Sequence, residues 1–257
     1  SRESYSLNWL GKSYARVLAN EPIRTMLSED TEHNEQKQNK NSHNLLIQGD
    51  NLEVLKHLKG AYSEKIKMIY IDPPYNTGSD GFVYHDNRSF TPEQFAELAG
   101  IDMDEAKRVL EFTQSNANSH SAWLTFIYPR LYIAKQLLKD DGVIFISIDD
   151  NEQAQLKILC DDIFGEANFV ADLSVVNNLK GRNDKKYIAR TNERLLMYVK
   201  SQDFSEYGLP LDESTLAEYK YTDGSGRYRL IELRKRGGAD TQQERPKMYY
   251  PFFVNPD

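Results

Sequence analysis

An apolar run followed by a rigid turn, IKMIYIDPPY, occupies residues Ile66 to Tyr75. The first six residues favour a buried strand, because apolar and strand-forming side chains dominate them. Two consecutive prolines can neither donate to a sheet ladder nor enter a helix interior, so the strand must end at Ile71. The sequence therefore predicts a strand that delivers the four residues from Asp72 to Tyr75 to its carboxyl end.

The segments around this strand alternate between strand and helix patterns. Leu45 to Ile47 predicts a short buried strand, and Asp50 followed by Glu53 has the spacing of a capping box before a helix that Gly60 ends. Further on, the apolar spacing predicts helices from 91, over 103–112, over 123–138 and over 149–164, and strands over 143–148, 169–176 and 195–199. This alternation is typical of an α/β fold with a mostly parallel, doubly wound sheet and helices on both of its faces.

Composition divides the 257 residues into three parts and excludes several classes of protein. A polar stretch from Ser28 to Asn44 predicts that residues 1–44 form an arm or linker. The alternating elements fill 45–200, and a polar, basic, turn-rich region with mixed α and β character follows over 201–257. With 39% hydrophobic and 28% charged residues, the chain is neither collagen-like nor wholly disordered.

Apolar runs and cysteine usage point to a cytoplasmic protein. No run approaches the roughly 18 apolar residues that a membrane-spanning helix needs. The single cysteine, Cys160, cannot form an intrachain disulfide. Five histidines lie at no metal-ligand spacing, so we expect no metal site. Asp149, Asp150 and Glu152 could hold a cation, but the dipole of the helix that follows them explains them better.

Charge is unevenly distributed along the chain. The net charge is −7, yet Lys180 to Arg190 contains five basic residues and one acidic residue, and Lys220 to Lys247 contains eight basic and four acidic residues. This asymmetry indicates an acidic scaffold with two basic surfaces for a polyanion. Solvated surface loops are the alternative interpretation.

The turn after the strand suits chemistry on an amine of a nucleobase. Such an amine is a poor nucleophile because its lone pair is delocalised into the ring, and two hydrogen-bond acceptors on its hydrogens would make it more reactive. Asp72 offers a carboxylate, Pro73 a backbone carbonyl of fixed direction, and Tyr75 a flat face for stacking a base. A structural Asp-Pro-Pro turn is the alternative.

Five longer motifs occur in order along the chain, and together they are more specific than the turn alone. They are QGDNLEVL at 48–55, IDPPYNTG at 71–78, Trp123-Leu124 with YPRL at 128–131, DGVIFISIDDNE at 141–152 and KGRND at 180–184. In this order they resemble the amino-group DNA methyltransferases that act on adenine, specifically the modification subunits of type III restriction-modification systems. Gly226 to Tyr250 also resembles the target-recognition region of that family.

The resemblance implies a Rossmann-like methyltransferase fold, S-adenosylmethionine as methyl donor and the N6 amine of adenine in duplex DNA as acceptor. Asp72, Pro73, Pro74 and Tyr75 match catalytic positions. Asp50 and Asp72 match positions that contact the cofactor, although Asp50 also reads as a plain helix cap. The glycine-rich Phe-x-Gly-x-Gly motif of the family is missing from the sequence, so we expect the fold to be incomplete in this chain.

The resemblance also implies partners and DNA contacts. Residues 45–200 would form the catalytic domain and 201–257 the start of the target-recognition region. The expected DNA contacts are Lys180, Arg182, Arg227, Arg234 and Arg236. A second copy of the chain and a restriction subunit with nuclease and translocase activity are the expected protein partners, with no membrane contact. A cytosine-N4 methyltransferase and a non-catalytic DNA-recognition or assembly fragment remain alternatives.

Overall fold

A computed structural model describes residues 7–78, 80–84, 88, 90–115, 118–177, 191–231, 241–248, 251 and 253 of the chain. The chain divides into two compact units, with the break between Ser205 and Glu206. The assignment of a catalytic domain before residue 200 and a recognition region after it stays a prediction. None of the helices in the described ranges is long and apolar enough to cross a membrane.

The first unit is built on a four-stranded sheet with the order β1-β2-β4-β3. The strands are β1 (Ile66–Ile71), β2 (Leu138–Ile148), β3 (Phe169–Val176) and β4 (Asn192–Val199). The α/β class is confirmed, but the described pairing is mixed rather than mostly parallel. β1 and β2 are parallel, because three helices cross over between them, whereas β4 is antiparallel to both β2 and β3.

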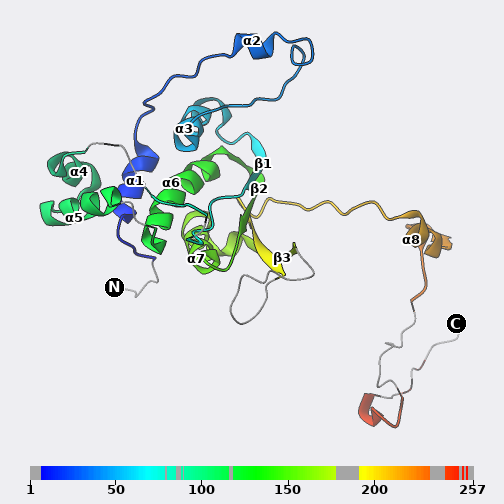
Figure 1. Cartoon of the computed structure of the whole chain (residues 1–257). Coiled ribbons are helices and arrows are strands. Elements are labelled where there is room, and N and C mark those ends of the chain that lie inside the picture. The colour runs from blue at the N-terminus through cyan, green and yellow to red at the C-terminus, as the bar shows by residue number, and fades with distance from the viewer. Residues whose placement is uncertain are drawn as a thin grey trace. The chain divides into compact units, whose positions relative to one another are not determined.

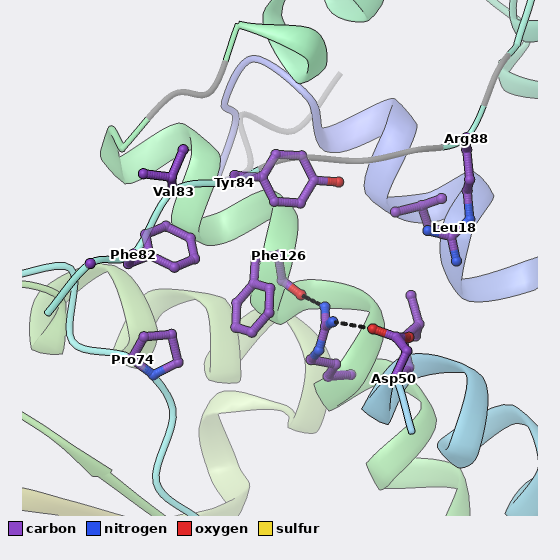
Figure 2. Close-up of a pocket in the computed structure, with 11 residues that line it drawn as sticks. Leu18, Asp50, Pro74, Phe82, Val83, Tyr84, Arg88 and Phe126 are labelled. Carbon is purple, nitrogen blue, oxygen red and sulfur yellow. Dashed lines mark hydrogen bonds and ion pairs between the residues drawn. The ribbon is translucent and has the colours of Figure 1, made fainter. Parts of the chain in front are cut away.

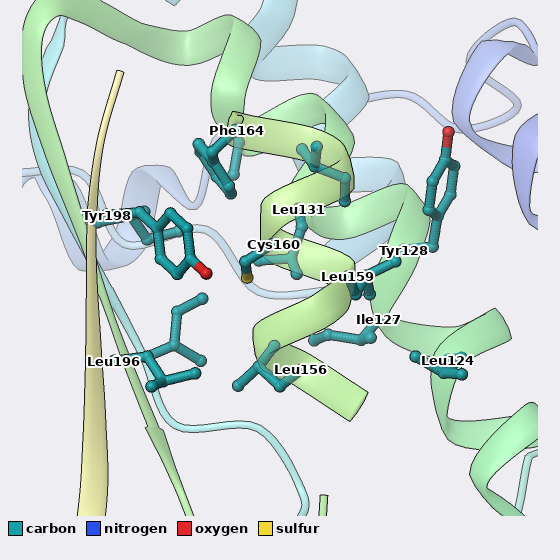
Figure 3. Packing of buried hydrophobic residues seen from close by; sticks show 14 of the residues in the cluster. Leu124, Ile127, Tyr128, Leu131, Leu156, Leu159, Cys160, Phe164, Leu196 and Tyr198 are labelled. Atoms are coloured by element: carbon teal, nitrogen blue, oxygen red, sulfur yellow. The ribbon is translucent and has the colours of Figure 1, made fainter. Parts of the chain in front are cut away.

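One face of this sheet carries the core. The register places Ile69 beside Ile144 and Ile144 beside Tyr198, so these side chains point to the same face. Helices α6 (His120–Leu137) and α7 (Gln153–Phe164) pack there (Figure 3). On the other face, Met68 and Tyr70 are more than half exposed. The expectation of helices on both faces is therefore not met along β1 by the part of the chain that the structure describes.

A second apolar cluster joins the N-terminal helix to the crossover helices. It involves α1 (Lys12–Asn20), α3 (Asn51–Tyr62), α4 (Pro92–Ala99), α5 (Met103–Gln114) and α6. Tyr14 and Leu18 of α1 are buried, and α1 packs against α6. The prediction of a polar arm over 1–44 is therefore wrong for α1, whose apolar side chains recur at helical spacing and form a stripe that must be covered.

The segment between α1 and α3 is mostly exposed. It runs through the short helix α2 (Thr31–Asn34) (Figure 1). Leu45 and Leu46 lie in irregular backbone, with most of their surface exposed. The strand expected over 45–47 is absent from the described structure, because no other strand pairs with this run. Gly60 does not end α3, which continues to Tyr62. The cap predicted at Asp50 is confirmed, and Thr91 caps α4 at the start expected for that helix.

The second unit has little regular structure in its described residues. It contains α8 (Glu213–Glu218) and a hairpin of β5 (Tyr221–Asp223) and β6 (Gly226–Tyr228). The rings of Tyr221 and Tyr228 stack across the hairpin with centroids 5.6 Å apart. Two short 3-10 helices complete the described elements of the chain, η1 (Glu166–Asn168) in the first unit and η2 (Pro246–Met248) in the second.

Candidate functional site

The Asp72–Asn76 loop leaves the carboxyl end of β1 as the two prolines require. Asp72 is exposed, and its Oδ1 accepts a hydrogen bond of 2.7 Å from the Tyr75 hydroxyl. The Tyr75 ring is half-buried and packs against the core. Burial and the bond to Asp72 both raise the pKa of Tyr75 above its ordinary value of 10, so the hydroxyl remains a donor at neutral pH. The loop thus presents a carboxylate whose orientation Tyr75 fixes.

Helix α6 anchors the loop on one side of Tyr75. The indole Nε1 of Trp123 donates a hydrogen bond of 2.6 Å to the backbone carbonyl of Pro74. Trp123 is itself fully buried in the core, so its position is set by packing. The contact therefore ties the Pro74 carbonyl to the buried core of the unit.

The segment after β2 anchors the loop on the other side of Tyr75. Asn76 has a positive φ of 56°, and its Nδ2 donates a 2.6 Å hydrogen bond to Oε1 of Glu152. The same oxygen lies 2.8 Å from Nδ1 of His120 at the start of α6. Because β1 and β2 are parallel neighbours, the segments that follow them meet at one edge of the sheet, where ligands bind in open α/β folds.

A pocket of about 330 Å³ lies between this loop and the start of α3 (Figure 2). Asp50 and Pro74 both line it, and Asp72 is not among the lining residues. The remaining lining side chains are mainly apolar or aromatic, with two arginines: Leu18, Leu52, Gly81, Phe82, Val83, Tyr84, Arg88, Phe126 and Arg130. A volume above about 300 Å³ with apolar walls and a few polar groups is typical of ligand pockets.

Asp50 has two roles at this pocket. Its Oδ1 caps α3 by accepting from the backbone N–H groups of Leu52 and Glu53, both at 3.1 Å. Its Oδ2 lies 3.8 Å from the guanidinium of Arg130. That guanidinium also donates to Asn51 Oδ1 at 2.6 Å and stacks 3.9 Å from the centroid of the Phe126 ring. The carboxylate is thus a helix cap and part of the pocket wall.

Buried ion pairs support the same wall. Arg88, which lines the pocket, pairs with Glu21 at 3.0 Å and with Glu53 at 3.2 Å, and Lys56 lies 3.0 Å from Glu53. Burial alone would raise the pKa of Glu53, but the backbone N–H of Arg24 and the two cations outweigh it and lower that pKa. Glu53 therefore stays ionised at neutral pH and keeps these pairs intact.

The structure places the sequence-predicted residues unevenly. It brings Asp50 and the Asp72–Tyr75 turn to neighbouring positions, joined by the pocket that Pro74 lines. Arg227 is exposed on β6 of the second unit. The other predicted DNA contacts lie outside the described residues: Lys180, Arg182, Arg234 and Arg236. Within the described ranges, no group of three His, Cys, Asp or Glu side chains is placed to hold a metal ion.

Sequence reasoning missed the residues that hold the loop and line the pocket. Glu152 was explained by the helix dipole, yet it makes no side-chain cap on α7 and binds Asn76 and His120 instead. Asn76, Arg130 and Glu152 each lie inside one of the five motifs. The motifs therefore carried the signal, but not the pairing between distant segments.

Comparison with known proteins defines the family. The profile described as DNA methylase matches residues 66–250, which include β1, the Asp72–Asn76 loop and Glu152. The chain belongs to the DNA methylase family. This confirms the family resemblance seen in the motifs and agrees with the α/β fold.

Several curated relatives are restriction-modification proteins. The chain is 59% identical over 257 residues to the type III EcoPI Mod subunit of Escherichia phage P1, covering 99% of this chain and 40% of that protein. It is 65% identical over 203 residues to the EcoP15I Mod subunit of Escherichia coli, covering 79% and 31%. The type II methyltransferase M.KpnI of Klebsiella pneumoniae is 39% identical over 209 residues, covering 81% and 44%. The chain thus spans less than half the length of each.

A solved structure, described as the M1.HpyAVI–SAM complex, also matches. It shares 14% identity with the chain at a TM-score of 0.36, and the match covers 65% of this chain and 60% of that one.

Proposed function

We propose that the chain forms the amine-activating part of an S-adenosylmethionine-dependent DNA methyltransferase. Its substrate would be the N6 amine of adenine in duplex DNA, and the enzyme would act as the modification subunit of a type III restriction-modification system. One observation carries the proposal. The loop after β1 presents an exposed carboxylate, Asp72, that is oriented by Tyr75 and anchored at both neighbours of Tyr75.

The loop offers two acceptors for the hydrogens of an amine. Trp123 already takes the Pro74 carbonyl, whereas among the described residues no donor binds the Pro73 carbonyl. The Asp72 carboxylate and the Pro73 carbonyl would therefore receive the two N–H groups. This would draw the nitrogen lone pair out of the ring and toward the methyl donor. A base taken out of the duplex would stack on Tyr75.

Asp72 would also handle charge during the reaction. As the new N–C bond formed, the bond from the methyl group to the sulfonium sulfur would break and leave a neutral thioether, and the nitrogen would gain positive charge and then have to lose a proton. A carboxylate that already accepts one of its N–H groups stabilises that charge and is the nearest proton acceptor. Because Asp72 is exposed, the proton can pass from it to solvent.

The pocket beside the loop would receive part of the methyl donor. S-adenosylmethionine supplies an electrophilic methyl group on a sulfonium when bound. Asp50 Oδ2 is an acceptor for hydroxyl or amine groups of an adenosyl moiety, and Phe126 offers an aromatic wall. Pro74 would bring this moiety next to the loop. The methionine end is not assigned to residues of this chain, whose sequence lacks the glycine-rich motif.

DNA and protein partners follow from the same proposal. Arg227 and the basic segment around Lys180 would contact duplex DNA in the cytoplasm, where a restriction subunit would join the modification subunit. The similarity to Mod subunits supports this assembly, and a homodimer stays a prediction.

The test is the identity of the methylated base. The full-length protein is incubated with S-adenosylmethionine and unmethylated plasmid DNA. The DNA is then digested to nucleosides, which are separated and identified by mass spectrometry. We expect N6-methyladenine, and none with Asp72→Ala. Detection of N4-methylcytosine instead would assign cytosine as the target base. DNA binding without any methylated base would instead support the non-catalytic recognition fragment.

A further inference from the structure

Glu152 is an unusual residue for the place it occupies. Its side chain has no exposed surface, yet it carries a carboxyl group at the start of α7. Its Oε2 is buried and has no hydrogen-bond partner in the described part of the chain. All its side-chain hydrogen bonds in this part converge on Oε1, from Asn76 and His120. A buried acceptor left unpaired is costly, so a purely structural site would favour an apolar side chain.

The two hydrogen bonds that hold the residues on either side of Tyr75 are connected to each other through α6. Trp123 fixes residue 74 and Glu152 fixes residue 76, at 2.6 Å in each case. Trp123 lies one turn after His120 on α6, and His120 contacts the same oxygen of Glu152. The first turn of α6 therefore reaches the loop directly through Trp123 and indirectly through Glu152.

Asn76 adds a reason for the second anchor. Its positive φ of 56° is a left-handed conformation, which asparagine adopts more readily than most residues but still not freely. The Glu152 bond holds the side chain of that residue and so selects this conformation. The next residue toward the N-terminus is Tyr75, whose hydroxyl orients Asp72.

We propose that Glu152 is a positioning residue for methyl transfer, which holds Asn76 in its left-handed conformation and thereby fixes Tyr75 and Asp72 for the target amine. The proposal rests on the proposed function. Glu152 acts through its acceptor oxygen and not through its charge, because Oε1 of a neutral side chain can accept the same two bonds. Burial raises the pKa of Glu152 despite its two bonds, and the nearby carboxylate of Asp149 adds to the rise.

The test compares variants of the full-length protein in steady-state methyl transfer. Glu152→Ala and Asn76→Gly each remove the bond, and glycine keeps the left-handed backbone accessible. We expect each to lower kcat by about 10- to 100-fold, the range for small misplacements of reacting groups, with a much smaller change in KM for DNA. The double variant should fall no further than either single variant, because both remove one interaction. Glu152→Gln should restore most of kcat.

Asp161→Ala is the matched control. Asp161 lies near the other end of α7 and accepts a 2.7 Å bond from the buried Tyr198, so its loss weakens the fold without touching the loop. At a temperature well below unfolding, we expect this variant to keep the wild-type kcat. An equal fall in kcat for Asp161→Ala and Glu152→Ala, multiplicative effects of the two loop variants, or no rescue by glutamine would overturn the proposal.

A second readout does not depend on catalysis. In a Trp9→Phe background, Trp123 is the only tryptophan, and its indole is bonded to the loop. Glu152→Ala and Asn76→Gly should shift its emission, and Asp161→Ala should not. If the wild-type protein methylated no DNA but these shifts occurred, the proposed function would fail while the anchoring of the loop stood. Unshifted emission in both loop variants would refute the anchoring itself.

Discussion

The Asp72–Asn76 loop and the β5–β6 hairpin are held in different ways. The loop is short and partly exposed, but buried side chains from α6 and the start of α7 bind the residues on both sides of Tyr75. The hairpin is exposed along both strands and is held by its own ladder and by stacking of Tyr221 on Tyr228. One region has its geometry imposed by the core, and the other carries its side chains on the surface.

This difference corresponds to the different requirements of catalysis and of DNA binding. Chemistry on an amine requires acceptors fixed to within a fraction of an ångström, which only rigid surroundings provide. Contacts to DNA phosphates depend on charge and tolerate movement. We therefore expect substitutions in the loop to change the rate of methyl transfer, and substitutions in the hairpin to change DNA binding.

Asp72 should give the largest effect. Asp72→Ala removes an oriented acceptor and should lower kcat by about 100-fold or more, with DNA affinity unchanged. Asp141 is a matched control, because it is a half-exposed aspartate on β2 that pairs with Lys67 of β1. Asp141→Ala should leave kcat unchanged. Incorporation of labelled methyl groups at near the wild-type rate by Asp72→Ala would contradict the assignment.

Substitutions of Tyr75 should give the next largest effect, and two of them separate the role of its ring from that of its hydroxyl. Tyr75→Ala loses base stacking of about 1–3 kcal/mol, seen as a fall in kcat/KM. Tyr75→Phe keeps the ring but loses the bond to Asp72, so its fall should be smaller. Equal losses in the two variants would mean that the hydroxyl, not the stacking face, is what the reaction needs.

Arg227 should affect binding alone. If it contacts a phosphate, Arg227→Ala should reduce the slope of log affinity against log salt concentration by about 0.9. If it contacts a base edge, discrimination between sequences should fall as well. Arg229, close by in the chain, already pairs with Glu218, so Arg229→Ala should change the slope less. Anisotropy titrations at several salt concentrations, with cognate and scrambled duplexes, measure the slope and the discrimination between sequences. An unchanged slope for Arg227→Ala would mean that Arg227 is a solvated surface residue with no contact to DNA.

The smallest expected effect concerns stability and pH. The folded pKa of Glu152 lies above its ordinary value of 4.5, so the folded state binds this proton more tightly than the unfolded state does. Its contribution to the free energy of unfolding is therefore present below the unfolded pKa and lost as pH rises through the folded pKa. Glu152→Gln lacks this loss and should gain stability relative to wild type as pH rises. Melting temperatures of the two proteins, measured at a series of pH values from below 4.5 upward, test this trend. A difference in melting temperature that does not change with pH would contradict it.

Local patterns predicted the parts of the fold that local forces decide. β1 runs from Ile66 to Ile71 as expected, because the prolines end it, and the 123–138 periodicity located most of α6. The strand at 45–47 was not formed, since a strand also needs a neighbour. The contact between Asn76 and Glu152 spans 76 positions in the chain, and single-sequence periodicity does not reveal such pairs. The position of Asp72 at the end of β1 could be predicted, whereas the residues that hold its loop could not. The role of Asp72 stays a prediction.

We infer that the anchored loop performs the chemistry, while the exposed hairpin serves DNA binding. Single-turnover methyl transfer at saturating DNA and S-adenosylmethionine tests it most directly, because saturation removes differences in affinity. We expect Asp72→Ala to lose about 100-fold or more in this rate, and Arg227→Ala to retain the wild-type rate. A wild-type rate for Asp72→Ala, or an equal loss in the two variants, would contradict it.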